Sequence, residues 1–513
     1  MKSPDGATET IWYGKADLPA FHPPKAETEM DTDVCVIGAG IAGLTTAYFA
    51  AAAGRSVVVL DEGPIGSGQT GRTSAHLASA IDDRFTEIER LHGKDGSRLA
   101  YESHAAAIDT IERISREEKI NCEFARLDAF LSSVPGDPPD LLDKEFEAAK
   151  RAGFADVEIV PRGGLDQNRC LRFGNQARFH PLLYLAGLAT AITRMGGRIY
   201  TGRRVIDVQG SDPKTRKPGR VKLQDMRKTF AAQHIVVATN TPAPINDWFG
   251  IYTKQSAYRT YVIGVVVPAG AVADALYWDT GDPYHYVRLE KSKDGRTDVL
   301  IIGGEDHKTG QFPKNGAPFV ALESWARPRF PMVKEVQYRW SGQVQEPADG
   351  LAFIGRAMTD KQEVFVATGD SGMGLTHGTI AGLLINDLID GKQNPWEKLY
   401  DPSRKMMNTE FVTENANVMK QYVDLLTPGE IKSVEDVPPG QGAVMREGLS
   451  KIAVYRDPQG RVHKCSAVCT HLQCIVQWNH VEESWDCPCH GSRFDPRGRV
   501  LMGPAIDDLP PID

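Results

Sequence analysis

Two short cysteine–histidine pairs near the carboxyl end constrain the fold of this 513-residue chain more than any other feature. The first pair is Cys469-Thr470-His471, and the second is Cys487-Pro488-Cys489-His490. Two thiols and two imidazoles are a complete ligand set for a metal centre, so the two loops have to meet. The short alternating run Ile452–Tyr455, together with Pro- and Gly-containing turns, predicts a small all-β module around these loops.

The spacing of the two pairs resembles the ligand signature of Rieske [2Fe-2S] domains, which also have Gly491-Ser492 and Gly503-Pro504 at these places. The resemblance implies that Cys469 and Cys487 bind one iron while His471 and His490 bind the other. Such mixed ligation raises the reduction potential. A zinc site with two cysteines and two histidines is the alternative.

Three further residues of this module have roles implied by the resemblance. Cys474 and Cys489 match the extra pair of respiratory-type Rieske proteins, in which a disulfide ties the two loops together. A disulfide is unusual in a cytoplasmic protein, so two free thiols are the alternative. Ser492 stands where relatives donate a hydrogen bond to a cluster sulfide. Phe494 replaces the tyrosine donor of high-potential relatives, so one hydrogen bond to sulfur is missing.

A second motif lies near the amino end. The buried-strand pattern Val34–Ile37 leads into Gly38-Ala39-Gly40-Ile41-Ala42-Gly43, followed by a helical run and by a strand that ends at Asp61-Glu62. The glycines permit a tight turn and let a helix N-terminus approach a pyrophosphate. An acidic residue about 20 positions further on is suited to bind a ribose hydroxyl. This pattern predicts a dinucleotide site.

From Thr32 to Asp390 the chain resembles the glycine and D-amino-acid oxidase-like flavoproteins. The resemblance rests on the first motif, the 68–73 and 234–240 segments, the 347–355 segment and the glycine-rich turn at 364–374. It implies FAD as the cofactor, with the last turn and its following helix meeting the flavin ring. The residues expected to bind FAD are Gly38, Gly40, Gly43, Asp61, Glu62, Thr70, Arg72, Thr73, Thr239, Gly369, Gly372, Met373 and Gly374.

The substrate pocket lacks the usual carboxylate anchors of that family. Amino-acid-oxidising relatives have an arginine where this chain has Val344, and sarcosine-oxidising relatives have a lysine where it has Thr376. This difference argues against a free α-amino acid as the substrate. The residues expected in a catalytic role are Tyr258, Tyr261, His285 and His377. Packing of a sheet face against a helix is the alternative explanation for the strand residues.

We therefore predict an α/β FAD-binding Rossmann-like domain with an inserted α+β substrate domain, followed by an all-β Rieske domain. The expected boundaries are 30–110, 155–245 and 340–395 for the FAD-binding domain, and 111–154 and 246–339 for the substrate domain. A helical linker at 396–428 leads to the Rieske domain at 429–513.

Charge and hydropathy exclude several partners. The net charge of −8 argues against nucleic acid. The longest uncharged stretch falls short of the roughly 18 apolar residues of a membrane-spanning helix. The first residues have charges where a signal peptide needs an apolar run, so we expect a cytoplasmic location.

These features favour an FAD-dependent dehydrogenase that oxidises an amine-like CH–NH small molecule and passes electrons through the cluster to an external one-electron carrier. One alternative is an electron-transfer reductase that takes electrons in through the Rieske domain. Another is an FAD amine oxidase that uses oxygen. A Rieske oxygenase would need a mononuclear iron site, and the thirteen histidines include no suitable close pair. A purely structural cluster is a further alternative.

Overall fold

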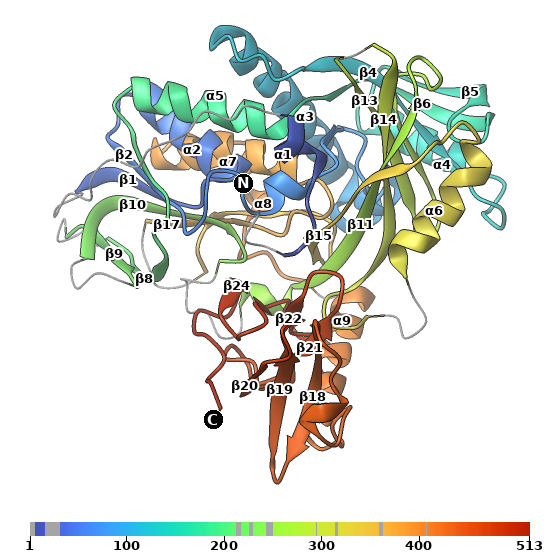
Figure 1. Ribbon diagram of the computed structural model, residues 1–513. Coiled ribbons are helices and arrows are strands. Elements are labelled where there is room, and N and C mark those ends of the chain that lie inside the picture. The colour runs from blue at the N-terminus through green and yellow to red at the C-terminus, as the bar shows by residue number, and fades with distance from the viewer. Residues whose placement is uncertain are drawn as a thin grey trace.

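The computed structural model describes residues 6–15, 31–211, 217–224, 229–242, 250–293, 295–312, 317–358, 363–406 and 408–512. Residues 1–5 and 16–30 lie outside the described residues. They include part of the amino-terminal segment whose charges argue against a signal peptide. Three β-rich regions are visible, and the carboxyl-terminal one forms a separate lobe beneath the junction of the other two (Figure 1). Among the described residues, no helix is both long and apolar enough to cross a membrane.

The first region is an eight-stranded sheet in the order β16-β17-β10-β1-β2-β7, with β9 joined to β10 and β8 to β9. Its central strands run parallel and are almost wholly apolar, as expected for a sheet buried on both faces. The helices α2 (Ile41–Ala52), α5 (Pro181–Arg194) and α7 (Gly374–Ile389) lie together over one face (Figure 1). The strands are β1 (Thr32–Ile37), β2 (Val57–Leu60), β7 (Arg198–Tyr200), β8 (Val205–Gln209), β9 (Gly219–Leu223), β10 (Thr229–Asn240), β16 (Phe353–Arg356) and β17 (Val364–Thr368).

The second region is a nine-stranded sheet in the order β15-β11-β14-β13-β12-β4-β6-β3, with β5 paired to β6. The sequence prediction assigned 155–178 to the cofactor domain, but this segment forms β5 and β6 of the other sheet. Alternating apolar residues predict a strand without specifying its sheet, because pairing is decided by contacts distant in sequence. The strands are β3 (His76–Leu77), β4 (Ala125–Ser132), β5 (Val157–Gly163), β6 (Asn168–Arg178), β11 (Gln255–Pro268), β12 (Leu276–Asp279), β13 (His285–Lys291), β14 (Thr297–Lys308) and β15 (Val336–Pro347).

The remaining helices pack around the two sheets or lead to the last domain. These are α1 (Ile11–Lys15), α3 (Phe85–Glu117), α4 (Leu141–Arg151), α6 (Pro318–Arg329), α8 (Glu397–Tyr400) and α9 (Thr409–Gln421). The carboxyl-terminal lobe contains two small antiparallel sheets, as its alternating pattern predicts. One is β18 (Gln441–Glu447), β19 (Ser450–Arg456) and β20 (Val462–Ser466); the other is β21 (Gln477–Asn479), β22 (Ser484–Asp486), β23 (Arg493–Phe494) and β24 (Val500–Met502).

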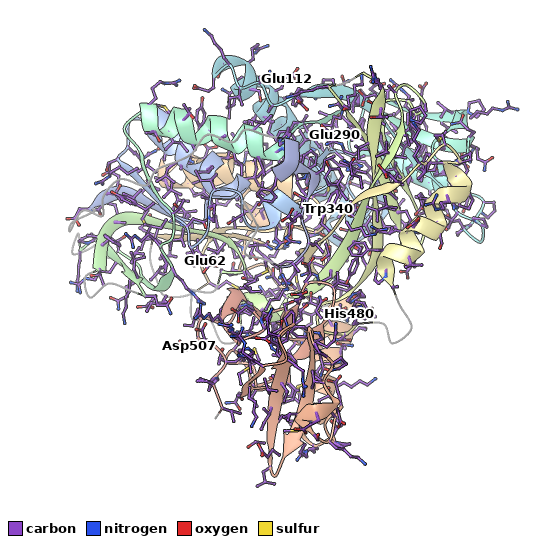
Figure 2. The ribbon with its side chains drawn as sticks, viewed as in Figure 1. Glu62, Glu112, Glu290, Trp340, His480 and Asp507 are labelled. Atoms are coloured by element: carbon purple, nitrogen blue, oxygen red, sulfur yellow. A yellow bond between two sulfur atoms is a disulfide. The ribbon has the colours of Figure 1, made fainter. Side chains whose placement is uncertain are left out.

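A buried ionic contact joins this lobe to the rest of the chain. Oε1 of Glu482 lies 3.1 Å from Nη1 of Arg72 and 3.3 Å from Nη2 of Arg259, and all three side chains are fully buried. The Thr8 and Ser341 hydroxyls also donate to the Glu482 carboxylate. His480 and Asp507 mark the two sides of the same junction (Figure 2). The lobe is thus attached by a polar core as well as by its linker.

Candidate cofactor sites and active site

The four predicted cluster ligands come together at the top of the carboxyl-terminal lobe. The rings of His471 and His490 lie perpendicular with their centroids 5.1 Å apart. The thiols of Cys469 and Cys487 hydrogen-bond to one another, and both are buried. The two loops of the sequence motif therefore converge in the way that a shared metal centre requires.

The chemistry of these four side chains fits an iron–sulfur cluster. Burial lowers the pKa of His471 to about 4 and that of His490 to about 3, so both imidazoles are neutral, as metal ligands must be. A hydrogen bond from Cys487 lowers the pKa of Cys469. Within the described part of the chain, the buried Nδ1 of His490 has no hydrogen-bond partner, which leaves it available for a metal.

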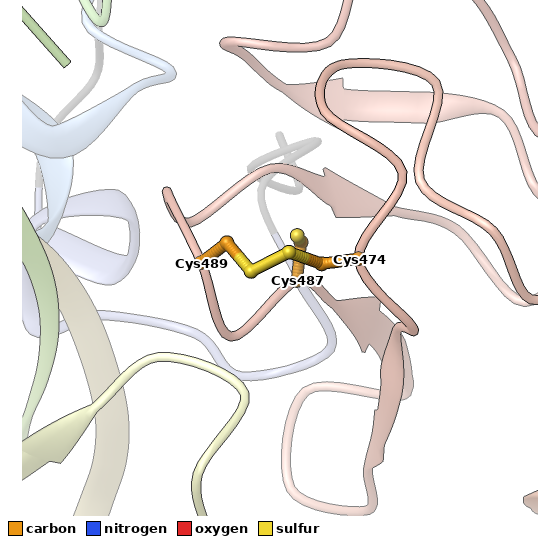
Figure 3. A group of neighbouring side chains, drawn as sticks. All are labelled: Cys474, Cys487 and Cys489. Carbon is orange, nitrogen blue, oxygen red and sulfur yellow. A yellow bond between two sulfur atoms is a disulfide. The ribbon is translucent and has the colours of Figure 1, made fainter. Parts of the chain in front are cut away.

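The second pair of cysteines forms a disulfide. Cys474 and Cys489 are bonded to each other, and the Cys487 thiol lies beside them (Figure 3). The pairing implied by the resemblance is thus confirmed, and the alternative of two free thiols is wrong. This bond ties the two ligand loops together and leaves Cys469 and Cys487 as the thiols available for iron.

The histidine side of the cluster site faces the flavoprotein part of the chain. The Tyr252 ring, from the short helix η2 (Ile251–Thr253), lies edge-on to His471 with centroids 5.0 Å apart. Nε2 of Gln343, on β15, donates to the Gly491 carbonyl at 2.9 Å. Gly491 has φ +78°, and a Cβ there would meet Ala257 at 2.3 Å. Sequence reasoning missed Tyr252 and Gln343, because no motif marks a contact between domains.

One long cavity runs from the β1–α2 turn to the start of α7. Gly38, Gly40 and Ile41 line it where the N-terminus of α2 opens into it. Met373, which precedes α7, and the first residues of α7 line it as well. Two helix N-termini therefore point their partial positive charge into one space, as a dinucleotide with a redox-active ring would need.

Most residues predicted to bind FAD line this cavity, namely Gly38, Gly40, Asp61, Glu62, Thr70, Arg72, Thr73, Thr239, Gly372, Met373 and Gly374. Gly43 instead lets α2 pack against the preceding turn, because a Cβ there would lie 1.9 Å from the Gly38 carbonyl oxygen. Gly369 takes φ +72° beside the cavity in the turn that shapes the wall. This glycine-built cradle fits the pyrophosphate and ring of FAD.

Of the two acidic residues after β2, Asp61 is the better placed ribose ligand. Its carboxylate accepts hydrogen bonds from the Ala39 and Gly63 amides, at 2.5 and 2.7 Å. Burial raises the pKa of Asp61 to about 7, which these amide bonds partly oppose. Glu62 is exposed and lies 3.5 Å from Arg204.

The residues expected in a catalytic role are only partly brought together. His377 lines the cavity at the first turn of α7. The expectation for Tyr258, Tyr261 and His285 is corrected, because their side chains are engaged elsewhere. Tyr258 donates to Glu414, Tyr261 bonds to His307, and His285 stacks on Trp325. Neighbouring residues on a strand face opposite sides, and here Thr260, Tyr284 and Tyr286 face the cavity.

Comparison with known proteins defines the class. The family model "DAO: FAD dependent oxidoreductase" matches residues 33–388, and the Rieske [2Fe-2S] domain model matches residues 427–513. The chain therefore belongs to the DAO family of FAD-dependent oxidoreductases and has a carboxyl-terminal Rieske domain. The predicted fold class is confirmed, and so are both cofactors, FAD and a [2Fe-2S] cluster.

Individual relatives share this organisation in whole or in part. YhfW of Bacillus subtilis, which is named as a Rieske 2Fe-2S iron-sulfur protein, is 32% identical over 99% of this chain and 98% of its own length. Gamma-glutamylputrescine oxidoreductase of Escherichia coli is 25% identical over 70% of this chain and 84% of its own length. The crystal structure of glycine oxidase from Geobacillus kaustophilus superimposes with a TM-score of 0.59 and 18% identity, covering 74% of this chain and 100% of that chain.

Proposed function

We propose that this protein is a dehydrogenase that oxidises an amine-like CH–NH small molecule and passes the electrons through its Rieske cluster to an external one-electron carrier. The observation that carries the proposal is that the Rieske domain forms part of the wall of the FAD cavity. The residues that contribute to this wall are Val500, Leu501, Met502, Gly503, Ala505 and Ile506.

A second contact connects the cavity with the cluster loop. Gln343 lines the cavity, and its side chain donates to the carbonyl of Gly491, the residue next to His490. Gln343 thus connects the wall of the flavin cavity with the cluster loop within one chain. This proximity supports direct electron transfer between the two cofactors.

The reaction balances as an amine dehydrogenation. FAD, when bound, accepts a hydride from the carbon next to nitrogen, and the [2Fe-2S] cluster accepts electrons one at a time. The N–H proton leaves to water, a C=N bond forms in the amine, and hydrolysis gives a carbonyl compound and a smaller amine. The two electrons would leave on two one-electron carriers, and the proton of the transferred hydride would be released to water.

The chain supplies orientation and electrostatics at the ring end of the cavity. The N-terminus of α7 places partial positive charge where negative charge develops on reduction. Burial lowers the pKa of His377 to about 4, so its imidazole is neutral, and its Nδ1 bonds to the Asp370 carbonyl at 2.9 Å. His377 therefore fixes the turn before α7 without adding a charge beside the ring.

An anaerobic amine titration tests the proposal. The holoprotein is mixed with amines, and flavin bleaching and the paramagnetic signal of the reduced cluster are recorded together. For a dehydrogenase, the extent of flavin bleaching and the paramagnetic signal of the reduced cluster both increase with amine concentration. An added one-electron acceptor then returns the flavin and the cluster to the oxidised state. Flavin bleaching with a permanently oxidised cluster would favour the oxidase, while cluster-to-flavin transfer without any response to amines would favour the reductase.

A further inference from the structure

The ring end of the cofactor cavity carries negative charge and aromatic surface. Among described residues that line the cavity, the basic side chains are Arg72, Arg203 and Arg204, together with two histidines. Arg72 pairs with Glu482 of the Rieske domain. Arg203 and Arg204 lie at the opposite end, where the Arg203 amide donates to the Asp61 carbonyl. The ring end thus has no lysine or arginine in its described wall.

Two carboxylates line this end, and that of Asp370 accepts a hydrogen bond from the backbone amide of Gln345. The Asp82 side chain lines the cavity and accepts a hydrogen bond from the Tyr284 hydroxyl. It reaches the glycine-rich turn before α7, since a Cβ at Gly372 would lie 2.5 Å from its Oδ2. Burial raises the pKa of Asp82 to about 6, and an ammonium group bound beside it would favour the ionised form.

Two tyrosine rings flank this carboxylate. Tyr284 and Tyr286 both line the cavity, and their ring centroids lie 5.7 Å apart with the planes tilted by 39°. The Tyr286 hydroxyl is held by Thr260 at 2.9 Å, which fixes the ring in the wall. A carboxylate that shares a wall with two aromatic rings is a suitable environment for an ammonium group, which can meet the carboxylate and a ring face together.

The same wall lacks the groups that would bind a carboxylate. Val344 and Thr376, which occupy the places of the arginine and lysine anchors in amino-acid-oxidising relatives, both line the cavity. A substrate carboxylate would lie near Asp82 without a cation to balance it. The charge pattern of the pocket is therefore the opposite of the one that an amino acid needs.

We infer that the substrate is a diamine or polyamine, in which one protonated nitrogen is bound by Asp82, Tyr284 and Tyr286 while a second, neutral nitrogen is oxidised. This inference rests on the proposed amine dehydrogenase function and specifies its substrate class. The oxidised C–N unit loses a hydride to FAD and its N–H proton to water, as above. The bound ammonium takes no part in the bond changes and serves to position the reacting carbon.

Three matched secondary amines test the inference. They are N-methyl-1,3-diaminopropane, N-methylbutylamine and 4-(methylamino)butanoate, each with three methylenes before the distal group, and homologues with longer spacers complete the series. They share the CH–NH unit and differ only in a distal ammonium, methyl or carboxylate group. Anaerobic flavin bleaching gives the half-saturating concentration of each. We expect the value for the diamine to be at least about tenfold lower than for the other two.

Charge-removing variants assign the preference to Asp82. Asp82→Asn keeps the shape of the side chain, and we expect it to raise the half-saturating concentration of the diamine roughly ten- to hundred-fold, so that the preference for the diamine over N-methylbutylamine is lost. Glu305→Gln is the matched control, because Glu305 faces His285 outside the cavity. If Asp82→Asn fails to retain FAD, Tyr284→Leu tests the same site through loss of the ring.

The outcomes separate the inference from the proposed function. If the three amines bleach the flavin equally, or if the carboxylate compound is preferred, the diamine inference is overturned while the dehydrogenase proposal stands. If dithionite bleaches the flavin but none of the amines does, the proposed function itself fails. A diamine preference that survives in both Asp82→Asn and Tyr284→Leu would show that the ammonium binds elsewhere.

Discussion

Replacing Glu482 should loosen the attachment of the Rieske domain, because this carboxylate pairs with two fully buried arginines at the junction, Arg72 and Arg259. Burial alone would raise the pKa of Glu482, but Arg72, Arg259 and Arg493 together lower it from 4.5 to about 2. A difference of that size corresponds to about 3 kcal/mol in favour of the ionised, docked state at neutral pH.

Glu482→Gln keeps the shape of the side chain but removes the negative charge that Glu482 places beside the two guanidiniums. Breaking a buried ion pair in this way costs about 3–5 kcal/mol. The assay is urea unfolding at pH 7, followed by the visible circular dichroism of the cluster, with Glu483→Gln as the control because Glu483 is exposed. A Glu482→Gln protein whose cluster transition stays within about 0.5 kcal/mol of the unaltered protein would refute this reasoning.

The ionic contact of Glu482 with Arg72 and Arg259 also predicts how the stability of the folded protein depends on pH. Since the pKa of Glu482 is lower in the folded protein, its contribution is complete above about pH 4.5 and disappears as the pH falls toward about 2. The Glu482→Gln protein should therefore lose less stability than the unaltered protein between these two values.

Three further predictions concern the cofactors. His471→Ala and His490→Ala should each remove the Rieske paramagnetic signal but leave FAD bound, since the cluster loops lie in a separate domain; joint loss of both cofactors in absorbance spectra would contradict this. Asp61→Ala should weaken FAD retention, measured by cofactor release on dilution, and full retention would transfer the ribose contact to Glu62. Rieske potentials span roughly −150 to +300 mV and rise with hydrogen bonds to sulfur. Phe494→Tyr should therefore raise the potential and Ser492→Ala should lower it in redox titrations, whereas an unchanged Phe494→Tyr potential would show that residue 494 faces away from the cluster.

Features set by short stretches of sequence were predictable. Cys469, His471, Cys487 and His490 lie within two tight loops, so their spacing alone indicates a shared centre. The turn around Gly38 is equally local, because its positive φ and close approach to α2 need glycine at fixed positions.

Features that depend on contacts distant in sequence were not predictable. Nothing around Tyr252 indicates that its ring meets His471, more than 200 residues away. The choice between the two faces of β11 and β13 likewise depends on which helices cover each sheet, and the prediction placed Tyr261 and His285 on the wrong face. Asp82 follows no motif and is recognisable only from its place in the cavity.

Transfer of electrons from flavin to cluster within one chain is the central claim, and a single-turnover experiment tests it most directly. The oxidised holoprotein is mixed anaerobically with a slight excess of a diamine in a stopped-flow instrument, and flavin and cluster absorbance are followed together. The flavin should bleach first, and cluster reduction should follow at a rate independent of protein concentration. A cluster that stays oxidised after the flavin has bleached, or that is reduced at a rate proportional to protein concentration, would contradict it.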